Sequence, residues 1–373
     1  MRKPGITAAT ISATPVASER FVWSLPSIRG ILAGIVTLAL LLEEEEESMR
    51  RISRGPAIIG ALAACCAVAV TGCGGGDDGG GGGAGEAATL KVGVIPIADV
   101  APLYLGMDKG FFKDEKLTIE PQLAEGGAAI TPAVLSGDFQ IGFSNTISLL
   151  IAASKGLPVQ IIAQGVLAGK TEKDAWADLL VLKDGPIASG KDLEGKTIAV
   201  NTLNNICEVT IKASLEKDGV DVDALKFTEV PFPDMNAALE AKRVDGACVV
   251  EPFVSQGKAG KARGIDPFYV RTAPDLTVAT YFTSKQYAQE NPEVVDRFVR
   301  AMNKSLTYAQ QNPDEVRKVL GEYTEIPDEA AEKIKLPVWR EDLNEPTIEK
   351  LSQLSKKYGL IEEEPDLGDL IRK

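Results

Sequence analysis

The 373-residue sequence contains no histidine. This absence excludes Ser-His-Asp and Cys-His catalytic arrangements, histidine proton shuttles and histidine metal sites. No glycine-rich dinucleotide pattern or Walker phosphate-binding pattern follows an expected strand, which argues against a nucleotide site. We therefore expect neither a metal nor a cofactor.

Positive charge is also scarce, with 40 Lys and Arg against 53 Asp and Glu and a formal net charge of −13. Nucleic-acid phosphates require a basic surface, so we expect no nucleic-acid partner. An acidic surface mainly favours solubility and says little about the ligand.

The apolar segment at 57–70 is shorter than the roughly 20 residues that a helix needs to cross a bilayer. Arginines precede it, and the sequence VTGC at 70–73 closes it. A basic region, a short apolar stretch and small residues before a cysteine are typical of a lipoprotein signal peptide. We expect residues 49–72 to be that signal, Cys73 to be lipidated, and the protein to be held on the extracytoplasmic face of the cell membrane. The alternative is a short membrane anchor or a buried helix.

Residues 1–48 precede this signal, although a secretory signal normally opens a chain. We interpret Met49 as the start of translation and residues 1–48 as not translated, because the glutamates at 43–47 imply purine-rich codons where a ribosome-binding site would lie. The rival interpretation is a genuine apolar segment at 31–42. Residues 73–88 are rich in glycine and aspartate, which predicts a flexible tether.

Cysteine is rare, with five residues in the chain. Cys65 and Cys66 lie in the signal segment and Cys73 is the expected lipid site, which leaves Cys207 and Cys248. Both lie in apolar segments, and this favours two buried thiols. A disulfide between them is the alternative, because an extracytoplasmic compartment permits one.

From residue 90 onward, short apolar strands alternate with helical patterns. This order predicts mostly parallel sheets covered by helices. The alternation occurs twice, at 90–163 and again at 196–250. We therefore expect an α/β, bilobal protein with two mostly parallel sheets and helices on both faces of each.

Two further apolar stretches, 179–182 and 278–282, bracket the second unit. We interpret them as strands that cross between the lobes, so that the second lobe is an insertion in the first. Lobe I then comprises 89–183 and 276–373, and lobe II comprises 184–275.

Ligands of open α/β sheets bind outside the carboxyl ends of the strands. The loops expected there carry hydrogen-bonding residues, and several open a helix, whose free N–H groups suit an anion or a polarised oxygen. The alternative for the polar ones is that they are simply N-caps. The group at 201–205 is the strongest case, because a single cap needs only one asparagine. The candidate ligand-binding residues are Ile97, Asp99, Gly126, Gly127, Ser144, Asn145, Thr146, Asn201, Thr202, Asn204, Asn205, Asp234 and Glu251.

A resemblance to a known family rests on 101–112 (APLYLGMDKGFF), 135–142 (LSGDFQIG), 193–200 (LEGKTIAV) and 244–253 (VDGACVVEPF). These segments resemble substrate-binding proteins of the nitrate/sulfonate/taurine and thiamine-precursor group, which serve ABC importers. The resemblance implies the type II periplasmic-binding-protein fold. In that fold, two α/β lobes close over one small molecule and the closed form docks on a permease.

The resemblance further implies a monomeric, non-enzymatic protein. Its expected partners are a small ligand, an ABC permease with its ATPase, and the membrane reached through Cys73. The expected ligand is a sulfonate, taurine, nitrate or a related organic acid.

The ligand class stays open at this point. The candidate loops contain no lysine or arginine, whereas Asp99, Asp234 and Glu251 could accept hydrogen bonds from an amine. A thiamine-precursor aminopyrimidine is therefore an alternative ligand. An enzyme or a sensor on the same fold is another alternative, although the thiamine-precursor chemistry of some relatives relies on a histidine.

Overall fold

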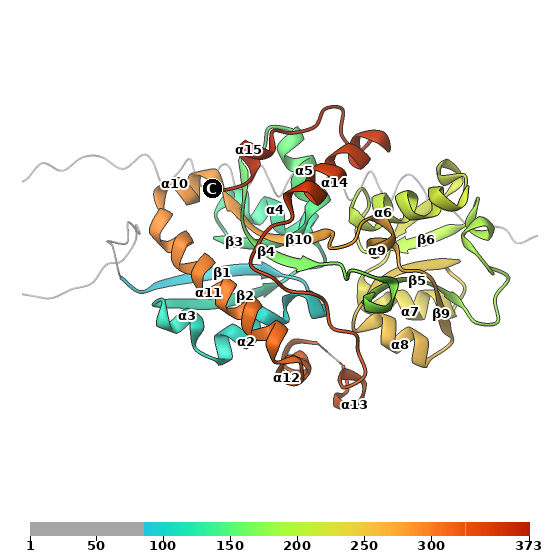
Figure 1. The fold of residues 1–373 in the computed structure, drawn as a ribbon, viewed down its shortest axis with the longest axis horizontal. Helices are drawn as coiled ribbons and strands as arrows, with labels where there is room; N and C mark the ends of the chain where they lie inside the picture. Colours follow the sequence, from blue (N-terminus) through green and yellow to red (C-terminus); the bar gives the residue numbers. More distant parts are fainter. Residues whose placement is uncertain (1–85, 325) are drawn as a thin grey trace, which may run out of the picture. The chain divides into compact units, whose positions relative to one another are not determined.

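The computed structural model describes residues 86–324 and 326–373, which are built around two five-stranded sheets (Figure 1). The expected signal peptide, the lipid site at Cys73 and most of the tether lie outside the described residues. The described residues all belong to one compact unit of the chain.

The first sheet has the strand order β2-β1-β3-β10-β4. β10 runs antiparallel to both of its neighbours, whereas β1 pairs in parallel with β2 and β3. Every residue of β3 is buried, as expected for a central strand that is covered on both faces. The strands are β1 (Ala88–Val94), β2 (Leu117–Leu123), β3 (Ile141–Asn145), β4 (Val159–Leu167) and β10 (Thr277–Ser284).

The second sheet repeats this arrangement with the order β7-β6-β8-β5-β9. β5 is antiparallel to β8 and β9, and β6 is parallel to β7 and β8. The prediction of an α/β protein with two similar, mostly parallel sheets is confirmed. The strands are β5 (Ala177–Leu182), β6 (Thr197–Val200), β7 (Lys226–Glu229), β8 (Gly246–Val250) and β9 (Ala262–Asp266).

Helices cover both faces of the first sheet. Phe282 of β10 lies beside Ile130 of α4, and both would contact a Cβ placed at Gly142. The adjacent residue, Tyr281, packs edgewise on Phe298 of α11. Because successive residues of a strand point to opposite faces, α4 and α11 lie on opposite sides of the sheet. The helices of this lobe are α2 (Ala101–Asp108), α3 (Phe111–Asp114), α4 (Gly127–Ser136), α5 (Thr146–Ser154), α10 (Lys285–Glu290), α11 (Pro292–Gln311), α12 (Pro313–Tyr323), α13 (Asp328–Ala331), α14 (Glu345–Lys357) and α15 (Leu367–Leu370), with the 3-10 helices η1 (Ala98–Val100) and η2 (Glu172–Asp174).

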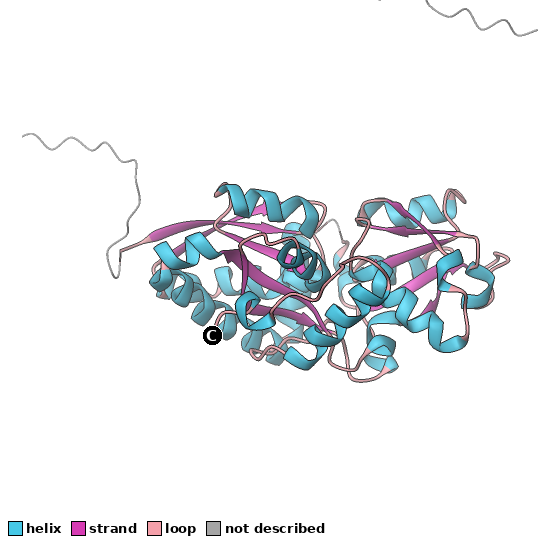
Figure 2. Cartoon of the chain, turned by 90° about the horizontal axis from the view of Figure 1, so that it is seen from above, coloured by secondary structure: helices cyan, strands magenta, loops and turns pink. Residues whose placement is uncertain are grey.

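The second sheet is likewise flanked by helices on both sides, which is visible when the chain is viewed from above (Figure 2). α6 buries a nearly continuous apolar face that includes Ile206, Val209 and Ile211. The helices of this lobe are α6 (Ile206–Leu215), α7 (Phe232–Glu240), α8 (Phe253–Ala259) and α9 (Phe268–Thr272), with the 3-10 helices η3 (Gly190–Leu193), η4 (Glu216–Asp218) and η5 (Val222–Ala224).

The two expected crossing strands do not cross, because each lies wholly in one sheet, and the strands of the second sheet all follow β4 and precede β10 of the first. The stretch 179–182 belongs to β5, which lies wholly in the second sheet, and 278–282 belongs to β10 in the first sheet. The chain therefore crosses through 168–176 and returns through 273–276. The lobe boundary thus precedes β5 and does not fall at 183. An apolar stretch reveals that a strand is buried but not which sheet it joins.

α14 contacts both lobes, because it packs against α5 of the first and α6 of the second. Lys357 and the hydroxyl of Tyr358 both bond the carboxylate of Glu216, at 2.5 Å and 3.0 Å. The C-terminal helices thus complete the first lobe, as the sequence predicts, and also contact the second.

Candidate functional site between the strand ends of the two lobes

Two adjoining hollows lie where the carboxyl ends of strands from both lobes meet. One has a volume of about 280 Å³ and the other of about 360 Å³. Both are lined by Pro96 after β1, Leu123 at the end of β2, and Pro233 at the start of α7. The larger one also includes Phe253 and Tyr323. Loops that follow β1, β2, β7 and β8 line these hollows, whereas none of the candidate ligand-binding residues does, and the lining surfaces are mainly apolar.

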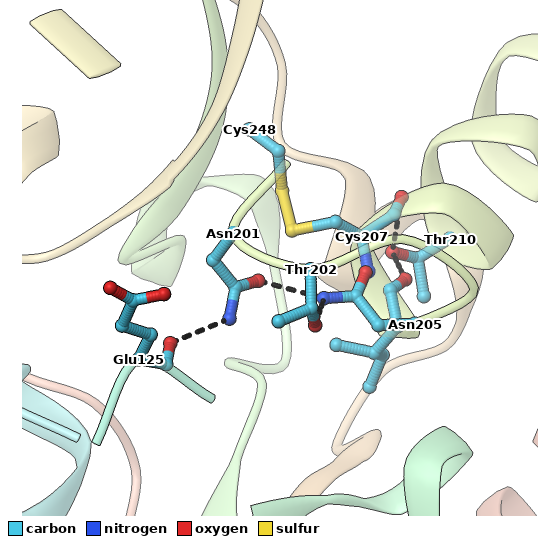
Figure 3. Close-up of a disulfide and its surroundings, with 8 residues drawn as sticks. Glu125, Asn201, Thr202, Asn205, Cys207, Thr210 and Cys248 are labelled. Carbon is cyan, nitrogen blue, oxygen red and sulfur yellow. Dashed lines mark hydrogen bonds between the residues drawn. A yellow bond between two sulfur atoms is a disulfide. The ribbon is translucent and has the colours of Figure 1, made fainter. Parts of the chain in front are cut away.

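Next to these hollows the two lobes touch directly (Figure 3). The side-chain amide of Asn201 donates a hydrogen bond of 3.3 Å to the carbonyl oxygen of Glu125. A Cβ at Gly126 would lie 2.9 Å from Asn201 Nδ2 and 3.0 Å from Thr202 Cγ2. A larger residue at this position would therefore have to displace the side chains of Asn201 and Thr202 in the opposite lobe.

The asparagines of the 201–205 loop hold one another. Asn205 Nδ2 donates to Asn201 Oδ1 at 2.7 Å and to Thr202 Oγ1 at 2.9 Å. Asn205 Oδ1 accepts from the backbone N–H of Cys207 and so caps α6. Asn204 is exposed and adopts a left-handed backbone with φ 52°. This loop therefore combines one N-cap with one contact between the lobes.

A disulfide joins Cys207 to Cys248, with a Cα–Cα distance of 6.1 Å (Figure 3). The prediction of two buried thiols is wrong in respect of pairing, although both residues are buried. The bond ties the first turn of α6 to β8, and hence fixes the loop that carries Asn201. Sequence patterns place both cysteines in the core but do not show that α6 begins beside β8.

In the first lobe, three predicted ligand residues instead serve the local fold. Asn145 caps α5, because its side chain accepts from the N–H of Ser148. The hydroxyl of Thr146 donates to the carbonyl oxygens of Thr277 and Val278 and thereby ties α5 to β10. Ser144 is fully buried, and its hydroxyl donates to the carbonyl of Asn145.

Gly127 begins α4 directly above Ser144. A Cβ at Gly127 would lie 1.9 Å from Ser144 Oγ, so this glycine is required by packing within the first lobe. Ile97 is buried, and its carbonyl oxygen accepts a hydrogen bond of 3.1 Å from the Tyr323 hydroxyl.

Glu251 is a buried carboxylate whose two oxygens are both occupied. Oε1 accepts from the Ser255 hydroxyl at 2.7 Å and the Lys335 N–H at 3.2 Å, and Oε2 accepts from the Ser255 N–H at 3.1 Å. Burial raises the pKa of the Glu251 carboxyl, and the hydrogen bonds from Ser255 and Lys335 oppose that rise. The Glu251 backbone oxygen also accepts from the N–H of Ala98, which makes a second link between the lobes.

Asp234 is exposed, and no side-chain hydrogen bond or ion pair to it is found in residues 86–324 and 326–373. It does not cap α7, since that helix begins at Phe232 and has no side-chain cap. Asp234 lies one residue beyond the hollows, which Pro233 lines.

Asp99 differs from the other two carboxylates. It is 3% exposed, and its Oδ1 has no hydrogen-bond partner among the described residues. Burial raises the pKa of the Asp99 carboxyl to about 8, and a hydrogen bond from its own backbone N–H opposes the rise. Asp99 is therefore a carboxyl group kept largely protonated near neutral pH and available to a partner.

The sequence reasoning missed the apolar lining of the hollows. Pro96, Pro233 and Pro252 each follow a strand closely, and this recurrence was the available signal. Leu123 ends β2 and is 61% exposed, so it presents an apolar surface to the hollows. Tyr323 comes from α12, and no sequence pattern connects it with the strand ends.

A larger cavity of about 670 Å³ lies between helices α4 and α5 and the tip of the 201–205 loop. Leu157 and Leu203 line it, each 41% exposed, together with Asn204. Its lining again comes from both lobes, but it contains none of the buried polar groups described above.

Within the described residues there is no cluster of acidic or cysteine side chains suited to a metal ion. In the same part of the chain, no helix combines the length and the apolar character that crossing a membrane would require.

A family model described as NMT1/THI5 like matches residues 97–316. The chain belongs to this family. The match includes the strand ends of both lobes and both crossing segments. The expectation drawn from the sequence resemblance is confirmed.

Members and structural neighbours support the same placement. The chain is 31% identical over 195 residues to the taurine-binding periplasmic protein of Escherichia coli, covering 52% of this chain and 58% of that protein. It is 24% identical over 282 residues to the riboflavin-binding protein RibY of Chloroflexus aurantiacus, covering 74% of this chain and 76% of that protein. The match to the taurine-binding protein thus spans less than two thirds of that relative.

The fold matches that of the alkanesulfonate-binding protein SsuA from Xanthomonas axonopodis, with a TM-score of 0.66, 18% identity and coverage of 78% of this chain and 99% of that one. The periplasmic-binding-protein fold is therefore shown. Some relatives of this chain carry enzyme names. The chain is 24% identical over 225 residues to a 4-amino-5-hydroxymethyl-2-methylpyrimidine phosphate synthase of Aspergillus parasiticus, covering 57% of this chain and 64% of that enzyme.

Proposed function

We propose that this chain is the solute-binding component of an ABC importer. It captures a small polar molecule between its two lobes on the extracytoplasmic side of the membrane and delivers it to a permease with its ATPase. The observation that carries the proposal is the convergence of strand ends from two similar lobes on one set of hollows, in a chain of the NMT1/THI5-like family.

The connection between the lobes suits a hinge. Within residues 86–324 and 326–373, the chain crosses between the two sheets at 168–176 and at 273–276. Helix α14 adds contacts to both lobes. A ligand that touches both lobes stabilises the closed form by the difference between its affinities for the closed and open forms. The Asn201–Glu125 and Ala98–Glu251 hydrogen bonds are closed-form contacts in this proposal.

We place the protein on the membrane through a lipid on Cys73, which follows the signal peptide at 49–72. A tether of glycine and aspartate would then let the lobes diffuse near the permease. In this proposal the chain acts as a monomer, because a single pair of lobes encloses the ligand.

The proposed ligands are taurine, other sulfonates, nitrate and related organic acids, because similar proteins are named for binding taurine, alkanesulfonates and nitrate. Of the predicted residues, we retain as ligand-facing Ile97, Asp99, Gly126, Asn201 and Thr202, which lie where the lobes meet. Asn145, Thr146, Asn205 and Glu251 support these residues, because their polar atoms are already bonded within the protein.

A titration of the full chain in detergent tests the proposal. The panel comprises taurine, ethanesulfonate, nitrate, aromatic acids, riboflavin and an aminopyrimidine. A compound present at ~100 times its Kd stabilises the fold by about 2.7 kcal/mol, which a thermal melt detects. No stabilisation by any member of the panel would count against a solute-binding role.

The second candidate is an enzyme or binder of thiamine-precursor pyrimidines, favoured by the similarity to a pyrimidine phosphate synthase. Mass spectrometry of each compound after incubation with the protein separates a binding protein from an enzyme. A recovered, unchanged compound supports binding alone, whereas chemical conversion would establish an enzyme.

A further inference from the structure

Of the carboxylates in the strand-end loops, only one is both buried and unpaired. Glu251 has both oxygens bonded, and Asp234 is exposed on the first turn of α7. Asp99 is 3% exposed, and its Oδ1 has no partner in the part of the chain that the structure describes. A buried acceptor without a hydrogen-bond partner is costly, so this one requires an explanation, and a ligand group is one that would satisfy it.

The turn that carries Asp99 is fixed by aromatic side chains. Tyr104 and Tyr323 stack with ring centroids 4.0 Å apart and 3° between their planes. The Tyr323 hydroxyl donates to the Ile97 carbonyl at 3.1 Å, and Trp339 Nε1 donates to the Asp99 carbonyl at 3.1 Å. Asp99 is therefore held in place by bonds to the backbone of its turn, and Oδ1 of its carboxyl group has no hydrogen-bond partner among the described residues.

Tyr281 contributes a second unpaired group. Its ring is fixed edgewise between Phe143 at 5.3 Å and Phe298 at 5.7 Å, yet its hydroxyl is buried without a hydrogen-bond partner among the described residues. Burial, and then the charges of Tyr104 and Asp99, raise the pKa of Tyr281. Asp99 and Tyr281 thus lie within electrostatic reach of each other.

This cluster of Asp99, Tyr104, Tyr281 and Tyr323 lies at the junction of the lobes. Ala98, the residue before Asp99, donates its N–H to the Glu251 carbonyl at 3.0 Å. Tyr323 also lines the 360 Å³ hollow. Separation of the lobes would break the Ala98 bond, which lies one residue from Asp99.

The cluster lacks any cation. No lysine or arginine is paired with Asp99 in residues 86–324 and 326–373, and no positive charge lowers its pKa. A carboxyl group surrounded by aromatic rings suits an organic cation, which gains a charge-assisted hydrogen bond and cation–π attraction. An anion placed at the same position would meet no compensating charge.

We propose that the ligand carries a protonated amino group, which Asp99 and Tyr281 receive within this aromatic cluster. The proposal rests on the solute-binding function and adds the chemistry of one end of the ligand. Binding of such a cation stabilises ionised Asp99, so the carboxyl proton is released as the ligand enters.

Matched pairs of probes test the proposal by isothermal titration of the full chain in detergent. Taurine is compared with ethanesulfonate, and 4-aminobutyrate with butyrate, so that each pair differs in one protonated amino group. At least one cationic member should bind ten or more times tighter than its partner without the cation. The proposal would be overturned if, in both pairs, the compound without the amino group bound as tightly as its counterpart or more tightly. It would also be overturned if neither amino compound bound measurably.

Variants show whether Asp99 causes that preference. Asp99→Asn keeps the shape of the side chain and should reduce the preference to less than threefold. Tyr281→Phe keeps the ring, removes the unpaired hydroxyl and should reduce it by about threefold to tenfold. Circular dichroism and melting confirm that each variant folds. A folded Asp99→Asn protein that retains the preference would refute the role of Asp99.

Proton release gives an independent readout. Titrations at pH 6.5 in two buffers of different ionisation enthalpy should show net proton release for the wild type and none for Asp99→Asn. Tight binding of ethanesulfonate or nitrate, unchanged by Asp99→Asn, would refute this inference and preserve the solute-binding function. No binding by the whole panel would refute both.

Discussion

The side-chain amide of Asn201 in the second lobe donates a hydrogen bond of 3.3 Å to the carbonyl oxygen of Glu125 in the first. We predict that Asn201→Ala weakens binding of the tightest ligand about fivefold to tenfold, because a net hydrogen bond contributes about 1 kcal/mol to closure. Calorimetry measures the change. Asn204→Gly is the matched control, since Asn204 is exposed and glycine tolerates its left-handed backbone. Equal affinities of Asn201→Ala and wild type would show that this contact does not contribute to closure.

Substitution of the adjacent glycines Gly126 and Gly127 by alanine should have different effects. A Cβ at Gly126 meets the second lobe, whereas a Cβ at Gly127 meets Ser144 of its own lobe. Gly126→Ala should lower ligand affinity and favour a more open form in small-angle scattering, with little change in melting temperature. Gly127→Ala should lower the free energy of unfolding by about 1–3 kcal/mol through overpacking. The same loss of stability in both variants would contradict this assignment.

Glu251 should matter for stability more than for ligand contact. Glu251→Ala leaves the N–H groups of Ser255 and Lys335 without their acceptor in a buried region. We expect the free energy of unfolding to fall by about 2–4 kcal/mol, measured by denaturant titration. Ser255→Ala removes one of the bonds and should cost less. A stable Glu251→Ala protein that has lost all binding would instead place Glu251 on the ligand.

Two buried carboxyl groups, Asp99 and Asp266, should each contribute a loss of stability to the ligand-free protein as the pH rises above about 4. Burial raises the pKa of Asp99 from 3.8 to about 8 and that of Asp266 from 3.8 to about 6. The folded state therefore holds protons that the unfolded chain has released, so stability falls with pH until each folded pKa is passed. Asp99 contributes a slope of up to about 1.4 kcal/mol per pH unit.

Denaturant titrations at pH 5, 6, 7 and 8 measure this slope. The difference between wild type and Asp99→Asn isolates Asp99, because Asp266 and Glu251 titrate in both proteins. The free energies of unfolding of the two proteins should differ less at pH 5 than at pH 8, because Asp99→Asn should lose less stability as the pH rises. Parallel pH profiles would show that Asp99 is already ionised in the folded state.

Reduction of the Cys207–Cys248 disulfide should destabilise the second lobe. The bond closes a loop with a sequence separation of 41 residues, for which chain entropy predicts a loss of about 2–4 kcal/mol. Denaturant titration with and without reductant measures it. The double variant Cys207→Ala/Cys248→Ala is the control and should not respond to reductant. An equal response in that variant would show that the reductant acts elsewhere.

The architecture could be predicted because buried strands and helix starts leave local patterns. Apolar stretches gave the strands, and Asn145 and Asn205 are the N-caps that their positions suggest. The site was harder, because a polar residue at a strand end suits a cap and a ligand equally. Only the distances show that Glu251 is satisfied internally and that Asp99 is not.

Pairing between distant segments could not be predicted for the same reason. The burial of Cys207 and Cys248 is local information, whereas their adjacency depends on how α6 meets β8. Likewise, β5 has the composition of a buried strand in either lobe. Its place between β8 and β9 depends on a register that forms only in the folded second sheet.

The position of β10 determines which of the two sheets can form first during synthesis. β10 lies between β3 and β4, so the first sheet stays split until the chain has been made as far as Ser284. The second sheet needs nothing beyond Asp266. A chain emerging from its N-terminus can therefore assemble the inserted sheet first, while β3 and β4 wait with unpaired edges that other chains could join. The interval between the synthesis of Leu167 and that of Thr277 is thus the period in which chaperones have most reason to cover the open edges of β3 and β4.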